Sequence, residues 1–213
     1  MFKGLFDLNS PFMRFLSLVG DLILINLMFI LCCLPVITAG ASACAMYTVT
    51  MQKVRKEDLS DGVAGPFFAA FKANFKKGTL IWIFYVLVGA AIAINRWLML
   101  GAGEEYSQFM KVLWIILLIL YTASVSWVFA VQARFENGVK ETIKNSLILA
   151  LAHPLSSVRV MICTAFPFVL LLYKTYYFLY SSAIWLMIGF SLLAYLNSMS
   201  FVGVFSGLEP DTQ

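Results

Sequence analysis

The chain has 213 residues, of which 62% are hydrophobic and 12% are charged, and its mean hydropathy is +0.88. Soluble domains carry about 25% charged residues, and a core built from so short a chain could not bury this much apolar surface. The composition therefore excludes an ordinary soluble domain and indicates a protein embedded in lipid. The net charge of +4 comes from a few clusters and gives no sign of a nucleic-acid partner.

Apolar residues follow one another along the chain without alternation. Residues Trp114 to Leu120, for example, read WIILLIL. A chain that crosses lipid must satisfy its backbone hydrogen bonds internally, as a helix or as a closed barrel, and barrel strands alternate apolar with polar residues. We therefore expect an all-α, polytopic transmembrane bundle of about six helices, which forms a single transmembrane domain over residues 1–213.

The first two predicted spans differ in length. An apolar run over residues 12–37 is long enough to cross about 30 Å of hydrocarbon. Pro35 should end this helix, because a proline disfavours helical geometry in the residue before it. Residues 39–54 form a shorter stretch with many small side chains, which allow close helix packing in lipid. We expect a short second span here; a re-entrant or interfacial helix is the alternative and would leave five spans.

Two basic segments precede later spans. In the first, Phe67, Phe71 and Phe75 recur at helical spacing among lysines, which predicts an amphipathic helix lying at the membrane surface. The second lies between residues 134 and 159 and is broken at His153-Pro154. Lysines in both segments are candidates for binding anionic lipid headgroups or for docking a partner. They are Lys72, Lys76, Lys77, Lys140 and Lys144.

The distribution of positive charge predicts the topology. The remaining spans are expected near residues 78–99, 112–131, 155–173 and 183–205. With six spans and the amino terminus inside, twelve of the fifteen lysine and arginine residues lie on the inner side, and Arg96, Lys111 and Lys174 lie outside. Because lysine and arginine favour the cytoplasmic side, we expect both termini in the cytoplasm. With five spans the amino terminus moves outside, and the later loops keep their sides.

A few polar residues fall inside the apolar runs. Asp21 lies some way into the first span, with Asn26 in the same helix. An ionisable group at such depth is costly and indicates a function, such as carrying a proton or contacting a solute. The alternative is a structural pair with a basic residue near the inner interface, such as Arg14 or Arg159. Further intramembrane polar candidates are Asn95, Arg96 and Asn197.

The residues that most catalytic and metal sites require are scarce. His153 is the one histidine in the sequence, and no H-E-x-x-H motif occurs. The four cysteines, Cys32, Cys33, Cys44 and Cys163, lie in apolar stretches, where a thiol usually serves as a small hydrophobe. We therefore expect no catalytic residues, no metal site and no cofactor.

Three segments, taken in order, resemble a known family. Leu34 to Ser42 (LPVITAGAS), Phe71 to Thr79 (FKANFKKGT) and Arg134 to Leu147 (RFENGVKETIKNSL) are similar to blocks of the YesL-like family of bacterial integral membrane proteins, whose function is uncharacterised. The resemblance covers nearly the whole chain and implies a location in the bacterial cytoplasmic membrane. Genes of that family often accompany carbohydrate ABC importers and their regulators. The resemblance therefore implies an accessory role in sugar uptake or sensing, and it supplies no site residues.

Three functional hypotheses remain open from the sequence. The first is a non-enzymatic membrane component that works with a carbohydrate ABC transporter through its basic cytoplasmic segments. The second is a small-solute transporter that uses Asp21. The third is a structural protein whose small-residue helix faces form a homo-oligomer.

Overall fold

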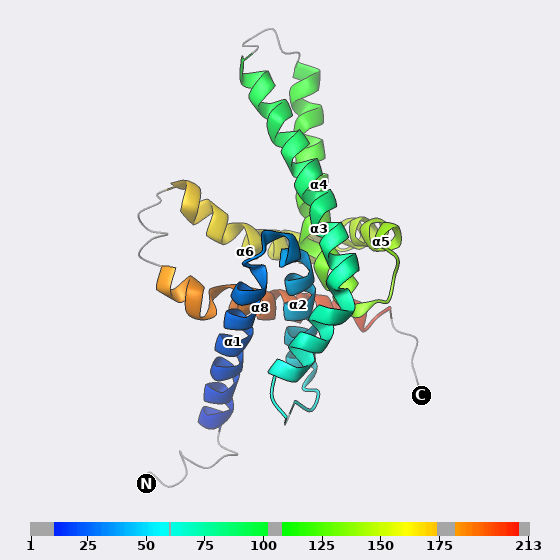
Figure 1. Ribbon diagram of the computed structural model, residues 1–213. Coiled ribbons are helices and arrows are strands. Elements are labelled where there is room, and N and C mark those ends of the chain that lie inside the picture. The colour runs from blue at the N-terminus through cyan, green and yellow to red at the C-terminus, as the bar shows by residue number, and fades with distance from the viewer. Residues whose placement is uncertain (1–10, 60, 102–107, 174–181, 209–213) are drawn as a thin grey trace.

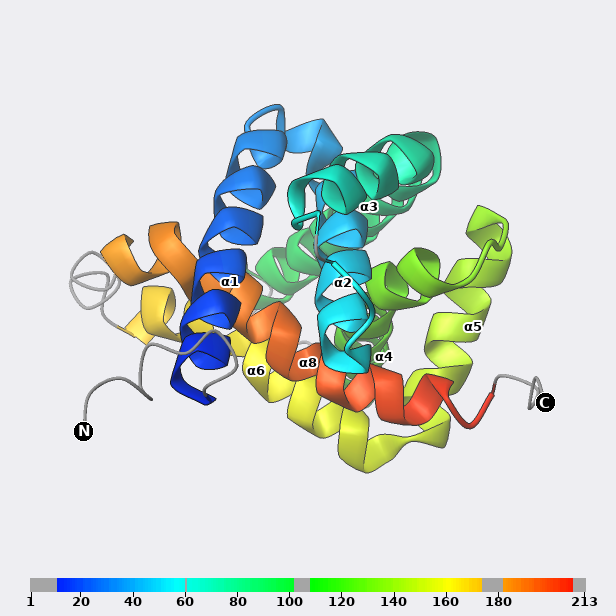
Figure 2. The same ribbon diagram turned by 90° about the horizontal axis from the view of Figure 1, so that it is seen from below.

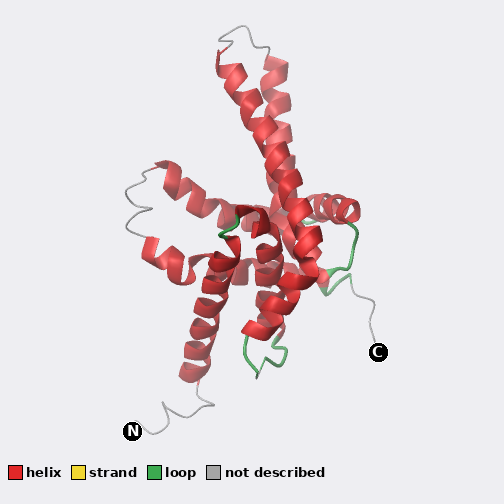
Figure 3. Cartoon of the chain, in the orientation of Figure 1, coloured by secondary structure: helices red, strands yellow, loops and turns green. Residues whose placement is uncertain are grey.

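The computed structural model describes residues 11–59, 61–101, 108–173 and 182–208, and in these segments every regular element is a helix (Figures 1 and 3). The all-α prediction is therefore confirmed. Six α-helices precede the last helical segment, Ser182–Phe205, which contains a π-helical turn near its start. The elements are α1 (Pro11–Cys33), the 3₁₀ turn η1 (Val36–Thr38), α2 (Ala39–Arg55), α3 (Ala64–Gly101), α4 (Gln108–Arg134), α5 (Val139–Ala152), α6 (Pro154–Tyr173), the π-helical turn η3 (Trp185–Gly189) and α8 (Phe190–Phe205).

The turn between α1 and α2 lies where the sequence predicts it. Helix α1 ends at Cys33, and the chain passes Pro35 before η1. The Thr38 hydroxyl donates a hydrogen bond of 2.5 Å to the carbonyl oxygen of Cys32, so it satisfies one of the carbonyls that a helix end leaves without an intrahelical donor. The predicted helix at residues 39–54 is present as α2, with 17 residues.

Helix α2 is the most enclosed helix of the described chain. It packs against α1, α3, α4 and α8, and Figure 2 shows it between these elements. Its small residues Ala41, Cys44 and Ala45 are fully buried, as is Val49. The small side chains noted in the sequence therefore serve close helix packing.

Helices α2 and α3 meet at two glycines. A Cβ added at Gly40 would clash with the backbone oxygen of Gly78, and a Cβ added at Gly78 would lie 2.9 Å from the Cα of Ala41. The obstructing atoms belong to the backbone and cannot move aside as a side-chain tip could. Both positions therefore require glycine for the observed approach of the two helices.

The first basic segment is not a separate surface helix. Residues 67–77, predicted to lie along the membrane surface, form the first turns of α3, which continues without a break to Gly101. The prediction failed because Gly78 was read as the start of a new element, whereas a single glycine inside a helix costs only about 1 kcal/mol. Residues 78–95 of α3 carry no charge. At about 1.5 Å per residue this stretch is about 27 Å long, close to the thickness of the hydrocarbon core.

Helices α3 and α4 form a hairpin that projects away from the other helices (Figure 1). The second basic segment forms α5, and the chain then bends by 109° into α6. The predicted break at His153-Pro154 is confirmed. The hydroxyl of Ser157 holds this corner: it donates to the carbonyl oxygen of Ala150 at 2.7 Å and accepts from the indole nitrogen of Trp127 at 2.9 Å.

Four helical segments of the described chain are long and apolar enough to cross a membrane, and the bent pair α5 and α6 would make a fifth. The four are Pro11–Cys33, Ala64–Met99, Gln108–Arg134 and Ser182–Phe205. The count is lower than six because α2 has 17 residues and because α5 and the described part of α6 are long enough only when taken together as one bent pair. The chain is therefore a multi-pass membrane protein built from helices.

Candidate functional site

Asn26 joins α1 to the wide turn before α8. Its amide nitrogen donates to the carbonyl oxygens of Trp185 and Leu186, at 2.9 and 2.8 Å, and its side-chain oxygen accepts from the backbone N–H of Ser191 at 3.0 Å. The residue is fully buried. A π-helical turn interrupts the regular hydrogen-bond ladder, and Asn26 supplies partners on both sides of it. The hydroxyl of Ser191 also donates to the carbonyl oxygen of Leu22 at 2.7 Å.

Asp21 is paired inside the protein. Its carboxylate accepts a hydrogen bond of 2.6 Å from the ammonium group of Lys53 on α2, and each side chain is 20% exposed. The partner is neither of the two arginines considered from the sequence. Arg159 instead donates to the hydroxyl of Ser200 on α8, and Arg14 lines the same pocket as the pair. This pocket has a volume of about 550 Å³ and lies between α1 and α2.

Asn197 belongs to a polar contact among α2, α6 and α8. Its amide nitrogen donates to the hydroxyl of Thr164 at 3.3 Å. One residue further along α8, the hydroxyl of Ser198 lies 2.8 Å from that of Thr50 on α2. Asn197, Ser198 and Thr50 are buried, so these hydroxyl and amide groups are used in holding helices together.

Asn95 and Arg96 lie far from the three polar residues above, near the projecting end of the α3–α4 hairpin. Both side chains are exposed. The Arg96 guanidinium stands over the Trp114 ring of α4, with 5.6 Å between its carbon and the ring centroid. The structure therefore separates the predicted intramembrane polar residues into different places and does not gather them into one site.

The two basic segments, by contrast, are joined. The ammonium group of Lys77 donates to the backbone oxygen of Asn137, just before α5, at 2.9 Å. A hydrogen-bond chain runs beside it: Gln132 donates to Asn74 at 3.1 Å and accepts from Thr142 at 2.8 Å. These bonds fix the start of α3 against the turn that leads from α4 to α5.

Most of the lysines in these segments remain exposed. We call the joined region the basic junction. Its lysines are Lys72, Lys76, Lys77, Lys140 and Lys144; Lys77 is half-buried and the other four are exposed. None of the five forms an ion pair with another residue of the described segments. Beside Lys77, a polar pocket of about 380 Å³ lies between α2, α3 and α4.

A network of hydroxyl groups joins α3, α4 and α5 and was not predicted from the sequence. The Tyr85 hydroxyl hydrogen-bonds Ser124 of α4, whose hydroxyl lies 3.1 Å from that of Ser146 on α5. Tyr121 also donates to the backbone oxygen of Tyr85 at 3.0 Å. Isolated serines and tyrosines inside apolar runs are common, so only their helical phase relative to other helices could have identified this network.

The described residues contain no cluster of three or more histidine, cysteine or acidic side chains that could hold a metal ion. All four cysteines are free thiols. His153 stacks against Trp127, with ring centroids 6.3 Å apart. In the described parts of the chain, the polar geometry thus consists of contacts between helices, one charged pocket and the exposed basic junction.

Comparison with known proteins gives one match. Residues 22–96, about a third of the chain, match the model of a family described as "Protein of unknown function, DUF624", an uncharacterised family that includes the YesL-like proteins. The matched segment contains Asn26, Lys53 and the glycine contact between α2 and α3. No curated protein and no solved structure matches the chain. The chain is thus a helical, multi-pass membrane protein with a segment similar to this family.

Proposed function

We propose that this protein is a non-enzymatic component of the bacterial cytoplasmic membrane, with both termini inside, that works with a carbohydrate ABC import or sensing system. The observation that carries the proposal is the basic junction. Two lysine-rich segments that lie about 60 residues apart are held together by the bond from Lys77 to Asn137. A rigid group of exposed cations is suited to recognising an acidic surface on a cytoplasmic partner.

The internal polar contacts support a binding role over catalysis or transport. Asp21 is neutralised by Lys53, and Asn26 and Asn197 are bonded to neighbouring helices. The contacts of these groups therefore explain their presence in the apolar interior as links between helices, without a bound solute. The basic junction differs from them because its exposed lysines have no acidic partner among the described residues.

The nature of the partner is supported by resemblance alone. The blocks at residues 34–42, 71–79 and 134–147 resemble the YesL-like family, whose genes often accompany carbohydrate ABC importers. Two of these three blocks form the basic junction. An importer subunit with an acidic cytoplasmic surface is therefore the partner that we propose.

The test is affinity purification from native bacterial membranes, with identification of importer subunits by mass spectrometry. We compare the natural chain with a variant in which Lys72, Lys76, Lys140 and Lys144 are replaced by glutamine. Importer subunits should co-purify with the natural chain and be depleted at least about tenfold with the variant, because several charge pairs would be lost.

The matched control is Lys111→Gln, which removes an exposed lysine at the opposite end of the α3–α4 hairpin. It should leave co-purification unchanged. The proposal is wrong if no importer subunit is enriched with the natural chain, or if the junction variant retains the subunits as well as the control does.

A second candidate function rests on the charged pocket between α1 and α2. Asp21, Lys53 and Arg14 border this space of about 550 Å³, and a small solute passing there would meet both signs of charge. Solute flux into liposomes by the purified protein alone, abolished by Asp21→Asn in a correctly folded variant, would support a transporter. Absence of flux would leave Asp21 as a structural residue.

A further inference from the structure

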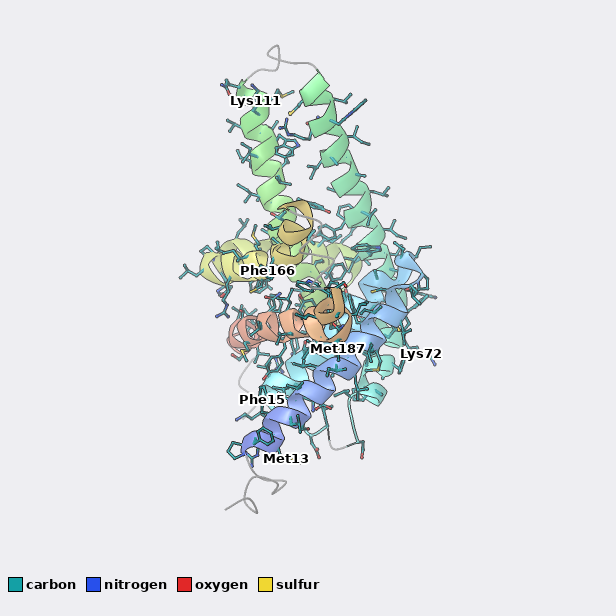
Figure 4. All side chains as sticks on the ribbon, turned by 90° about the vertical axis from the view of Figure 1, so that its left-hand side faces the viewer. Met13, Phe15, Lys72, Lys111, Phe166 and Met187 are labelled. Atoms are coloured by element: carbon teal, nitrogen blue, oxygen red, sulfur yellow. The ribbon has the colours of Figure 1, made fainter. Side chains whose placement is uncertain are left out.

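An apolar groove of about 530 Å³ runs along the α3–α4 hairpin. Figure 4 shows the two helices of the hairpin side by side, with Lys111 labelled near its end. Its lining runs from Met99 and Met110 at one end, past Asn95 and Trp114, to Tyr85 and Tyr121, with Ser124 and the α5 residues Ile143 and Leu147 at the other end. Its lining is almost entirely apolar, apart from Asn95 at one end and hydroxyl groups at the other.

Two cations flank residues that line the Asn95 end of the groove: Arg96 follows Asn95 in the chain, and Lys111 follows Met110. Arg96 stacks over the Trp114 ring, and Lys111 is exposed one helical turn before this tryptophan. The indole nitrogen of Trp114 donates to the backbone oxygen of Ile92 at 3.2 Å, which holds the ring across the groove. Stacking occupies the face of a guanidinium and leaves its N–H edges free to donate. Neither cation has an acidic partner within the described segments.

We propose that this groove holds one anionic phospholipid, with its phosphate bound by Arg96 and Asn95 and one acyl chain lying along the groove. The part of the groove between Asn95 and Tyr85 has the length that such a ligand requires. From Asn95 to Tyr85 the rise along α3 is about 15 Å, at about 1.5 Å per residue, and one leaflet contributes about half of a hydrocarbon core that is about 30 Å thick. A phosphate at Arg96 would therefore lie at headgroup depth, and the chain end would reach the level of Tyr85.

The chemistry of the groove favours a lipid over a helix from another protein. Its lining is apolar apart from Asn95 and a few hydroxyl groups, and the Arg96 guanidinium stands beside it over the Trp114 ring. An anionic headgroup joined to a hydrocarbon chain matches both features.

The acyl-chain part of the proposal is tested with two adjacent alanines. Ala91 lines the groove, whereas Ala90 is exposed and lies outside it. Delipidated protein in detergent is titrated with dioleoylphosphatidylglycerol, and bound lipid is counted by native mass spectrometry. Ala91→Phe should fill the groove and weaken binding of the first lipid at least about tenfold. Ala90→Phe should bind as the natural chain does, since the added ring points elsewhere on the helix.

The headgroup part is tested at Arg96. Arg96→Gln should weaken binding of dioleoylphosphatidylglycerol about tenfold, the effect expected for a lost charge-assisted hydrogen bond, and Arg96→Lys should recover part of it. Dioleoylphosphatidylcholine, with its compensating positive charge, should bind several-fold more weakly.

Several results would overturn the proposal. One is equal binding of the two lipids to the natural chain; another is equal loss of binding in Ala90→Phe and Ala91→Phe. Retention of lipid by Arg96→Gln would also overturn it. A second copy of the chain found in the groove in place of the lipid would overturn it as well.

Discussion

Asn26 makes hydrogen bonds to backbone groups that lie 159 to 165 residues further along the chain. Its position in an apolar run marked it as a residue of interest from the sequence. The partners could not be identified in the same way, because they are backbone groups and carry no sequence signature. They become available only where the last helix widens into a π-helical turn.

Replacing Asn26 with leucine should destabilise the protein. The substitution leaves the carbonyl oxygens of Trp185 and Leu186 and the N–H of Ser191 without this partner, and we expect a loss of about 1–3 kcal/mol in the free energy of unfolding. The measurement is unfolding in mixed micelles, followed by circular dichroism. Leu27→Ala, at the adjacent and exposed position, should change the free energy of unfolding much less. Equal effects of the two substitutions would contradict this role.

The Asp21–Lys53 pair allows a double-mutant test. Asp21→Asn and Lys53→Met each leave a partly buried charge without its partner, and each should cost about 1–2 kcal/mol, a value between those of surface and buried pairs. Because one removal makes the other less costly, the double variant should lose less than the two single variants together. Additive losses, measured by the same unfolding method, would show that the pair contributes no coupling.

The sequence identified Asp21 as an unusual residue for a membrane span, and it suggested Arg14 or Arg159 as the basic partner. The structure shows Lys53 instead. Both arginines considered lie near the ends of their helices. Lys53 lies near the end of the predicted segment 39–54, which the structure shows as α2 (Ala39–Arg55) packed against α1. The pairing could not be predicted, because the sequence does not show which faces of the two helices meet.

Among the helices, α2 and α3 show how small residues set the distance between elements. Gly78 faces backbone atoms of Ala41 with no room for a methyl group, whereas Gly65, in the first turn of the same helix, has no neighbouring atom within 4 Å of an added Cβ. Replacing glycine with alanine is therefore expected to lower stability at position 78 and to leave it unchanged or raise it at position 65.

Gly78→Ala should force α2 and α3 apart and cost about 1–3 kcal/mol, the usual cost of overpacking. Gly65→Ala should be neutral or stabilise α3 by up to about 1 kcal/mol, because alanine favours helix. Unfolding in mixed micelles measures both changes. A neutral Gly78→Ala would show that the helices are less closely packed than the structure describes.

The existence of most helices followed from apolar runs, but their ends and angles did not. Hydropathy located α1, α4 and the helix at residues 182–205, because lipid imposes a simple length requirement on spanning segments. It divided α3 at Gly78, since a change from amphipathic to apolar composition need not coincide with a break in the backbone. The bend of 109° between α5 and α6 depends on tertiary contacts such as that of Ser157, which composition does not record.

At the scale of the whole molecule, the basic residues form two separate groups, and a buried aromatic cluster lies between them. The lysines of the basic junction lie at the start of α3 and on α5, and Arg96 and Lys111 lie near the projecting end of the hairpin. Between them, Trp127, Phe201 and Phe205 form an aromatic core at the crossing of α4 and α8, with 4.9 Å between the ring centroids of Trp127 and Phe201. The separation of charges is visible in the sequence, but the contact between these rings could not be predicted from it.

The separation of charges makes a labelling prediction. In a chain whose native cysteines are replaced, single cysteines at positions 72 and 144 should react with an impermeant maleimide only after the cells are opened, and a cysteine at position 111 should react in intact cells. The reason is the preference of lysine and arginine for the cytoplasmic side. Labelling of positions 72 and 144 in intact cells would show that the predicted topology is inverted.

The wide turn at Trp185–Gly189 also has a consequence for the geometry of the last helix. One additional residue in a turn rotates everything beyond it by about 100° relative to an unbroken α-helix. The turn itself can therefore pack against α1 while the helix beyond it presents Asn197 to α6 and Phe201 to α4. One extra residue in the turn thus lets a single continuous helix direct side chains toward neighbours that a regular α-helix could not contact together. The hydrogen bonds from Asn26 on α1 hold the turn at this position.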